Sequence, residues 1–407
     1  MDLCETSLSR RALLGTSGAL FAWAFMPRIA GAAGGRDARF VCIVLRGALD
    51  GLAAVAPVGD PAYAGLHGDL ALSLDGEIPA LPLDGFFALH PSMPNFARLY
   101  RAGQASVVHA AATGYRERSH FDGQDVLESG QPAPGKIETG WLNRFLAGLP
   151  AGDRVAPAGA LGVGPVAPLV VRGPAPVLGW SPAVLPPAGD DLADRLAALY
   201  AERDPALHRM LVEGLKTEDL IAMNGPAIRR QGGLSDPKGM SRTALGAARL
   251  LAQQEGPRIA GLAFEGWDTH ANEGGVKGQL ANRLRGLDDA IGVFAETLGP
   301  TWKDTALMVV TEFGRTARIN GTRGTDHGTG TVVLLAGGAI RGGRVIADWP
   351  GLSDAALLDG RDLRPTTDVR SVAKGILADL FGAPAGYLAR DVFPDTAGLA
   401  PLKDLVA

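Results

Sequence analysis

The sequence predicts an α/β protein in which a doubly wound, mostly parallel sheet is flanked by helices. The first observation is a set of short apolar runs that are typical of strands buried on both faces. These runs are residues 40–45, 105–111, 259–264, 306–311 and 331–336. The second observation is that segments with helical periodicity separate most of the runs. Ligands of such sheets bind at the carboxyl ends of the strands, so we look for a functional site there.

The helices are recognised by apolar residues at helical spacing and by their boundary residues. We expect them at residues 93–102, 119–129, 192–223, 241–254, 276–298 and 367–380. Thr366 or Thr367 is expected to cap the last one, because a threonine hydroxyl accepts a hydrogen bond from the first turn. An irregular or β insertion is expected at about 150–190, where proline, glycine and valine are frequent and helical periodicity is absent.

The N-terminus has the layout of a secretory signal peptide. Arg10 and Arg11 stand directly before an apolar stretch at residues 12–26, and small residues at 30–32 offer a cleavage site. Paired arginines are typical of the twin-arginine (Tat) pathway. We therefore expect residues 1–33 to be a Tat signal peptide, with the Tat translocase as a partner during export. The alternative is an uncleaved amphipathic helix.

Residues 34–407 then form the mature protein, whose length suits a single α/β domain. We expect it in the periplasm or outside the cell, with no permanent membrane anchor, because the apolar stretch at 12–26 is short for a bilayer. The chain carries a net charge of −4; residues 1–33 hold three arginines and two acidic residues, so the remainder carries −5. This charge argues against nucleic acid as a partner. Cys42 is the one cysteine left, so no intramolecular disulfide forms.

Acidic residues and histidines collect beside the predicted strands. They are Asp50 after the first strand, Asp268 and His270 after the strand at 259–264, Glu312 after the strand at 306–311, and Asp326 and His327 before the strand at 331–336. Carboxylates and imidazoles together suit a divalent cation, which also relieves the repulsion between carboxylates. Each residue also has a structural alternative, such as a turn for Asp50. We predict that these six residues bind one or two ions of Zn, Mn or Ca.

Ser119 is equivocal, because a serine that opens a helix is either its N-cap or, beside a metal, a nucleophile. Arg116 and Arg315 are candidates for holding an anionic group, and His120 and Asp122 for partners of the ligands. The remaining histidines are interpreted as ordinary surface or core residues, with His109 the first candidate for an exception: His67, His90, His109 and His208.

Seven ordered segments carry a family resemblance: LRGALDGL, HPSMPNFARLY, RSHFDGQD, GWLNRFL, GWDTH, TEFGRT and GTDHG. After a twin-arginine signal, they resemble the DUF1501 family of exported bacterial proteins, which is grouped with the alkaline phosphatase-like superfamily. The resemblance implies an alkaline phosphatase-like domain over the whole mature chain, with two divalent metals at the sheet edge and a Ser, Thr or formylglycine nucleophile, although the chain has no Cys-x-Pro-x-Arg sequence for a formylglycine. In that superfamily the substrates are phosphate or sulfate esters.

The resemblance also implies roles for individual residues. Asp50 matches the first bridging aspartate, Asp268 and His270 match a metal-binding Asp and His, His327 matches the last histidine ligand, and Ser119 falls where the nucleophile is expected. The sequence departs from the pattern at two places: Asp268 and His270 are only two residues apart, and Glu312-Phe313 replaces an Asp-His pair. One metal or an altered pair therefore stays open.

We predict an exported metal-dependent hydrolase of phosphate or sulfate esters, with an anionic ester as its substrate. The alternative is a catalytically degraded member that acts as a periplasmic binding or assembly protein, with another exported protein as its partner. A metal-free serine hydrolase is not favoured, since the mature chain has no Gly-x-Ser-x-Gly elbow.

Overall fold

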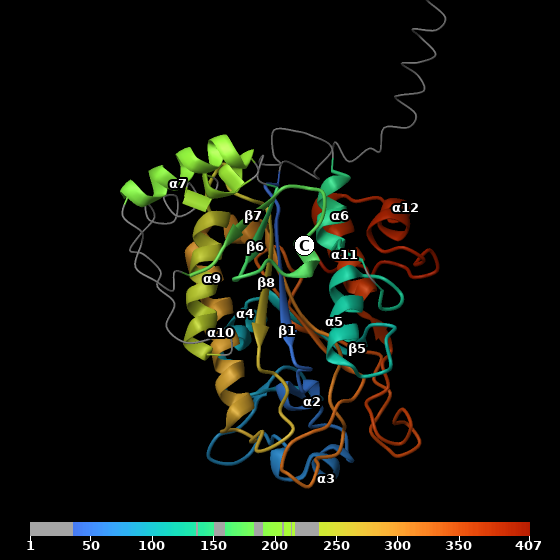
Figure 1. Cartoon of the computed structure of the whole chain (residues 1–407). Helices are drawn as coiled ribbons and strands as arrows, with labels where there is room; N and C mark the ends of the chain where they lie inside the picture. The colour runs from blue at the N-terminus through green and yellow to red at the C-terminus, as the bar shows by residue number, and fades with distance from the viewer. Residues whose placement is uncertain are drawn as a thin grey trace, which may run out of the picture.

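The computed structural model describes residues 36–407 except 136, 150–158, 183–189, 206, 213 and 216–235. The expected signal peptide lies outside the described residues, as do parts of the predicted helix 192–223 and of the predicted insertion. Within the described residues a nine-stranded sheet forms the centre of the molecule, in the order β11-β5-β10-β9-β1-β8-β6-β7, with β12 also pairing with β5 (Figure 1). Its strands are β1 (Arg39–Arg46), β5 (Ala105–Ala112), β6 (Ala160–Val163), β7 (Val177–Trp180), β8 (Ile259–Glu265), β9 (Thr305–Thr311), β10 (Thr331–Ala336), β11 (Arg344–Ile346) and β12 (Thr367–Asp368).

The sheet is mixed but mostly parallel, which confirms the predicted fold class. Strand β10 runs antiparallel to β5 and β9, and the other pairings in this sheet are parallel. The register brings the carboxyl ends of neighbouring strands level: Arg46 pairs with Glu265 of β8, and Leu45 pairs with Thr311 of β9. The loops that follow these strands therefore begin side by side.

Helices cover both faces of the sheet, as the unbroken apolar strands predict. Alternate side chains of β1 enter opposite cores: Ile43 packs in the core that holds α4, α9 and α10, while Cys42 packs in the core that holds α6 and α11. The two sets lie on opposite sides of the strands in Figure 1. Their bounds are α4 (Pro94–Arg101), α9 (Pro237–Leu251) and α10 (Gln279–Leu298) on one face, and α6 (Trp141–Ala147) and α11 (Val369–Phe381) on the other.

Shorter elements complete the described part. Helix α5 (His120–Ser129) follows β5 by a loop, and a small sheet has the order β2-β4-β3. The remaining elements are α2 (Gly51–Ala54), β2 (Val55–Ala56), α3 (Tyr63–His67), η2 (Gly68–Leu70), β3 (Leu81–Pro82), β4 (Ala88–Leu89), η3 (Leu169–Val171), α7 (Asp190–Arg203), η4 (Gly299–Asp304), α12 (Ala385–Tyr387) and η5 (Leu388–Val392). Among the described residues, no helix is both long and apolar enough to span a membrane.

Two local expectations are refined by the structure. In the segment expected to be irregular or β, β6 and β7 extend the main sheet beyond β8. The expected threonine cap of the last helix is wrong: Asp368 is the N-cap, and its carboxylate accepts a hydrogen bond from Arg370 N. Thr367 is instead the first residue of β12 and pairs with Ala111 of β5.

A buried carboxylate on α10 caps a neighbouring helix. Asp288 accepts hydrogen bonds from the backbone N–H groups of Asn95 (2.9 Å) and Phe96 (2.8 Å) in the first turn of α4. Met93, the N-cap residue of α4, makes no capping hydrogen bond of its own. Burial raises the pKa of Asp288 to about 6, although these two hydrogen bonds oppose the shift.

We expect Asp288 to make stability depend on pH. The pKa of Asp288 is higher in the folded protein than in the unfolded chain, so the protonated side chain favours folding. Its contribution to the free energy of unfolding is complete below about pH 4 and is lost as the pH rises through about 6. The free energy of unfolding of Asp288→Asn, minus that of the wild type, should rise by up to about 3 kcal/mol between pH 4 and pH 8. Urea unfolding at a series of pH values measures this difference; a difference that is constant over the range would contradict it.

Candidate metal centre

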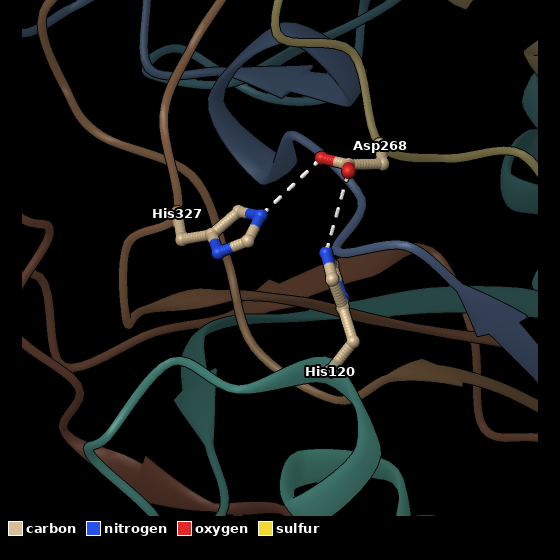
Figure 2. A group of neighbouring side chains, drawn as sticks. All are labelled: His120, Asp268 and His327. Atoms are coloured by element: carbon tan, nitrogen blue, oxygen red, sulfur yellow. Dashed lines mark ion pairs between the residues drawn. The ribbon is translucent and has the colours of Figure 1, made fainter.

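Three histidines and one aspartate meet beyond the carboxyl ends of the central strands. This His–Asp cluster consists of His120 at the start of α5, Asp268 and His270 in the loop after β8, and His327 in the loop before β10. Figure 2 shows the rings of His120 and His327 directed at the two oxygens of Asp268. The Nε2 atoms of His120 and His327 lie 3.4 Å from Oδ2 and Oδ1 of Asp268, and His270 Nε2 lies 3.0 Å from Oδ1.

The orientation of each imidazole is set from behind by a hydrogen bond to Nδ1. The three pairs are His120 with Glu312 Oε1 (2.8 Å), His270 with Asp326 Oδ1 (3.1 Å) and His327 with the carbonyl oxygen of Arg118 (3.0 Å). A carbonyl or a carboxylate can only accept, so each Nδ1 carries the proton. In a neutral ring, Nε2 then presents its lone pair to the cluster. Metal-binding histidines are held by outer partners of this kind.

The donor set fits a divalent cation. The Nε2 atoms of His270 and His327 are only 2.9 Å apart, and ligand atoms of His120, Asp268 and His327 all lie within 4.8 Å of one another. Metal–ligand bonds of about 2.0–2.2 Å separate neighbouring ligand atoms by about 3–4 Å. The Nε2 atom of His120 is buried and has no hydrogen-bond partner. Imidazole nitrogens favour zinc or manganese over calcium, which prefers oxygen ligands.

Arg315 lies beneath the cluster and is almost completely buried. It donates from Nη1 to Asp268 Oδ1 (2.7 Å), while its other nitrogens are held by Thr325. Burial by itself would raise the pKa of Asp268, but the hydrogen bond and charge of Arg315 outweigh it and lower that pKa. Arg315 therefore neutralises Asp268, and in this arrangement its guanidinium does not face solvent, where we expected it to hold an anion.

Glu312 stands behind His120. It is fully buried, and its Oε1 accepts from Gly47 N (2.8 Å), His120 Nδ1 (2.8 Å) and Gln124 Nε2 (3.1 Å), while Oε2 accepts from Thr311 Oγ1 (2.9 Å). Burial would raise the pKa of Glu312, and the hydrogen bonds, that of His120 first, lower it below its usual value. With both oxygens engaged, Glu312 orients the ring of His120 rather than facing the cluster.

Asp50 is placed apart from the cluster. Its Oδ1 accepts from Ala53 N (2.9 Å) and caps α2, and its Oδ2 lies 3.6 Å from Nε2 of His67. Both side chains are buried. Among the described residues, no hydrogen bond or ion pair joins Asp50 to the cluster. Asp326, in contrast, reaches the cluster through His270.

Comparisons with known proteins identify the family. Residues 37–382 match a family model described as "Protein of unknown function (DUF1501)". The chain belongs to this family. The search of curated proteins gives no match.

Several solved structures are similar to this DUF1501 protein. Ps i-CgsB in complex with k-i-k-neocarrahexaose shares 13% sequence identity, with 85% of this chain and 72% of that chain covered and a TM-score of 0.43. The phosphonate monoester hydrolase of Agrobacterium radiobacter shares 13% identity, with 85% of this chain and 74% of that chain covered and a TM-score of 0.36. A protein in the alkaline phosphatase superfamily from Vibrio parahaemolyticus shares 12% identity, with 89% of this chain and 71% of that chain covered and a TM-score of 0.40. With TM-scores below 0.5, these likenesses inform neither the site nor its substrate.

Of the predicted catalytic residues of this DUF1501 protein, Arg315 binds Asp268 of the cluster, whereas Ser119 and Arg116 make only local hydrogen bonds among the described residues. Ser119 occupies the N-cap position of α5, yet its side chain makes no capping hydrogen bond, so the capping interpretation is wrong. Its backbone N–H donates to Tyr115 Oη at 3.2 Å. Arg116 donates from Nη1 to the carbonyl oxygens of Thr113 (2.5 Å) and Tyr115 (2.7 Å).

Sequence reasoning gave His120 a supporting role, whereas its Nε2 faces Asp268 as directly as that of His327. The available signal was its position in the segment that follows β5, where polar residues gather at the sheet edge. The roles of Arg118 and Thr325 were missed, because they act through a backbone carbonyl and a buried hydroxyl, for which the sequence carries no pattern.

We expect Glu312→Gln to lower the pKa of His120 in the metal-free DUF1501 protein. The hydrogen bond to Glu312 is the main cause that raises this pKa, against the opposing effect of burial. An NMR titration of the His120 ring measures the change. Gln124→Met is the matched control, since it removes an uncharged partner from the same Glu312 oxygen and should leave the pKa of His120 near its wild-type value. An unchanged pKa in Glu312→Gln would refute this assignment.

Proposed function

We propose that this DUF1501 protein is an exported, metal-dependent hydrolase of phosphate or sulfate esters. The observation that carries the proposal is the approach of the His270 and His327 Nε2 atoms to 2.9 Å, with Asp268 Oδ1 beside both. Two lone pairs at this distance repel each other, and a cation between them replaces repulsion with two bonds. His120, Asp268, His270 and His327 would hold the ion, for which zinc and manganese are the best matches.

The charge of the site supports an anionic substrate. Asp268 is paired with Arg315 and neutral imidazoles add no charge, so a divalent ion would make the face formed by the four ligands positive, while the carboxylates of Glu312 and Asp326 lie behind the rings of His120 and His270. The side chains of Asp268 and His270 are 40% and 44% exposed, which makes the centre accessible to a solute. When bound, a divalent ion stabilises the negative charge that develops on a transferred phosphoryl or sulfuryl group.

Residues of the chain prepare the site for this chemistry. Glu312, Asp326 and the Arg118 carbonyl keep protons on the three Nδ1 atoms, so the Nε2 atoms are available as ligands. Arg315 keeps Asp268 ionised. Ser119 is the proposed nucleophile because it directly precedes His120; its backbone N–H donates to the Tyr115 phenol, and its hydroxyl would have to be activated by the ion in order to react.

A binding or assembly function is the second candidate, and one observation favours it. Neither Ser119 nor Arg116 makes a described hydrogen bond to the cluster. The same arrangement is expected in a family member that no longer uses a nucleophile. The metal-loaded protein should be assayed with aryl phosphate and aryl sulfate esters, with and without a chelator. Chelator-sensitive turnover supports the hydrolase, and a stoichiometric metal without turnover supports the binding function.

We expect Asp268→Ala and His270→Ala to lower metal content and thermal stability together. An ion that binds only the native state stabilises it by mass action, by about 2.7 kcal/mol at a hundredfold excess over Kd. Metal analysis and melting curves of the purified variants, with and without added zinc, measure the two effects. His208→Ala, at a histidine outside the cluster, is the control. Wild-type metal content in both cluster variants would rule out this centre.

Export is expected to depend on Arg10 and Arg11. Replacing both with lysine keeps the charge and removes the twin-arginine pair, so full-length precursor should accumulate in the cytoplasm. Immunoblots of periplasmic and cytoplasmic fractions measure the distribution. Normal appearance of the mature protein outside the cytoplasm would show that the Tat assignment is wrong.

A further inference from the structure

A single buried carboxylate joins the two loops that carry His120 and His327. Asp362, between β11 and β12, is fully buried. Its Oδ2 accepts from Arg118 Nε (3.0 Å) and Nη2 (2.7 Å) and from Thr329 Oγ1 (2.8 Å). Arg118 lies two residues before His120, and Thr329 lies two residues after His327. One oxygen atom therefore ties the two loops together next to the cluster.

The backbone of Arg118 adopts a conformation that non-glycine residues avoid. Its φ angle is +59°, in the left-handed region, and such a conformation persists only where the surroundings hold it. In this conformation its carbonyl oxygen accepts the Nδ1 hydrogen bond of His327 (3.0 Å). The two-pronged ion pair with Asp362 holds the side chain of the same residue, so it also fixes the place of that carbonyl.

The segment that contains Asp362 also contacts the backbone of His327. Arg361 donates from Nη2 to the carbonyl oxygen of His327 at 2.6 Å. His327 is therefore held at its main chain by Arg361 and at its ring by the carbonyl of Arg118. Asp362 is the next residue after Arg361, and its carboxylate binds the Arg118 side chain. Without the Arg118 carbonyl, nothing described would select the tautomer with the proton on Nδ1.

We infer that Asp362 is a positioning residue for the metal centre, which acts through Arg118 to hold His327 with Nδ1 protonated and Nε2 directed at Asp268. The inference rests on the proposed function for its consequence, which is metal affinity. Asp362 itself touches none of the four cluster residues by any described hydrogen bond or ion pair. Its effect on the proposed ion is thus indirect. It depends on the negative charge of Asp362, whose Oδ2 accepts hydrogen bonds from two nitrogens of Arg118.

The test is the zinc affinity of Asp362→Asn, measured on the full mature chain by competition with a chromophoric chelator. Loss of an outer partner of a metal-binding histidine weakens binding about 10- to 100-fold, and we expect a weakening in this range. Arg118→Lys keeps the positive charge but loses the pair of hydrogen bonds to Asp362, so it should also weaken zinc binding, by a smaller factor. It also serves as the second variant if Asp362→Asn does not fold.

Glu128→Gln is the matched control. Glu128 is buried and accepts Arg46 Nε (3.2 Å) and Nη2 (2.7 Å), but it lies on α5 eight residues beyond His120, about 12 Å along the helix. It should destabilise the fold and keep wild-type zinc affinity. Wild-type affinity in folded Asp362→Asn, or equal weakening in Glu128→Gln, would overturn the inference.

A second readout does not depend on metal binding. In nitrogen NMR spectra of the metal-free protein, the wild-type His327 ring should show a protonated Nδ1 and a bare Nε2, and Asp362→Asn should show a mixture of tautomers. A His327 tautomer that does not change would overturn the inference. If the wild type binds no zinc, the proposed function fails, while this spectrum still decides whether Asp362 positions His327.

Discussion

The whole centre depends on the close approach of two imidazole nitrogens, Nε2 of His270 and Nε2 of His327, at 2.9 Å. Each ring donates from Nδ1 to an acceptor that has no proton to give, so neither can escape the repulsion by exchanging its tautomer. Burial, the His120 ring when it is protonated, and the charge of Arg315 lower the pKa of His327, which disfavours protonation of that ring. The proposed metal ion would satisfy both lone pairs at once, so the outer hydrogen bonds that hold the two rings would matter as much as the ligands themselves.

The sheet topology explains why residues so distant in sequence meet. Parallel strands β1, β8 and β9 deliver their following loops to one edge because their last residues are in register. Strand β10 runs the other way, so the loop that precedes it lies at that same edge. His327 therefore joins Asp268 although it stands before its strand and Asp268 stands after one. A purely parallel sheet would have placed His327 at the opposite end.

The sequence was sufficient for the five central strands β1, β5, β8, β9 and β10 and for the edge at which the cluster lies, because their long apolar runs carry that information, but not for the short strands β11 and β12. It could not decide how a carboxylate is used once it reaches the edge. Asp50 is retained by the first turn of α2, and Glu312 is enclosed by four donors. The use of Asp50 is a local cap, the turn role that the sequence offered as its alternative, whereas the use of Glu312 follows mainly from tertiary hydrogen bonds to Gly47, His120 and Gln124, which are far away in sequence. For the same reason, sequence reasoning assigned His120 a supporting role and passed over Asp362.

Arg315 links the cluster to a second group of charges inside the protein. Its Nε donates to Thr325 Oγ1, and this hydroxyl donates in turn to Oε2 of Glu273 (2.8 Å), which is fully buried. Burial, and next the charge of Asp50, raise the pKa of Glu273, while Arg315 opposes the shift. The same guanidinium thus neutralises an exposed carboxylate on one side and attracts a buried one on the other. Removing Arg315 would leave Asp268 without its cation and would raise the pKa of Glu273 further, so the chemistry of the cluster cannot be separated from the electrostatics of the interior behind it.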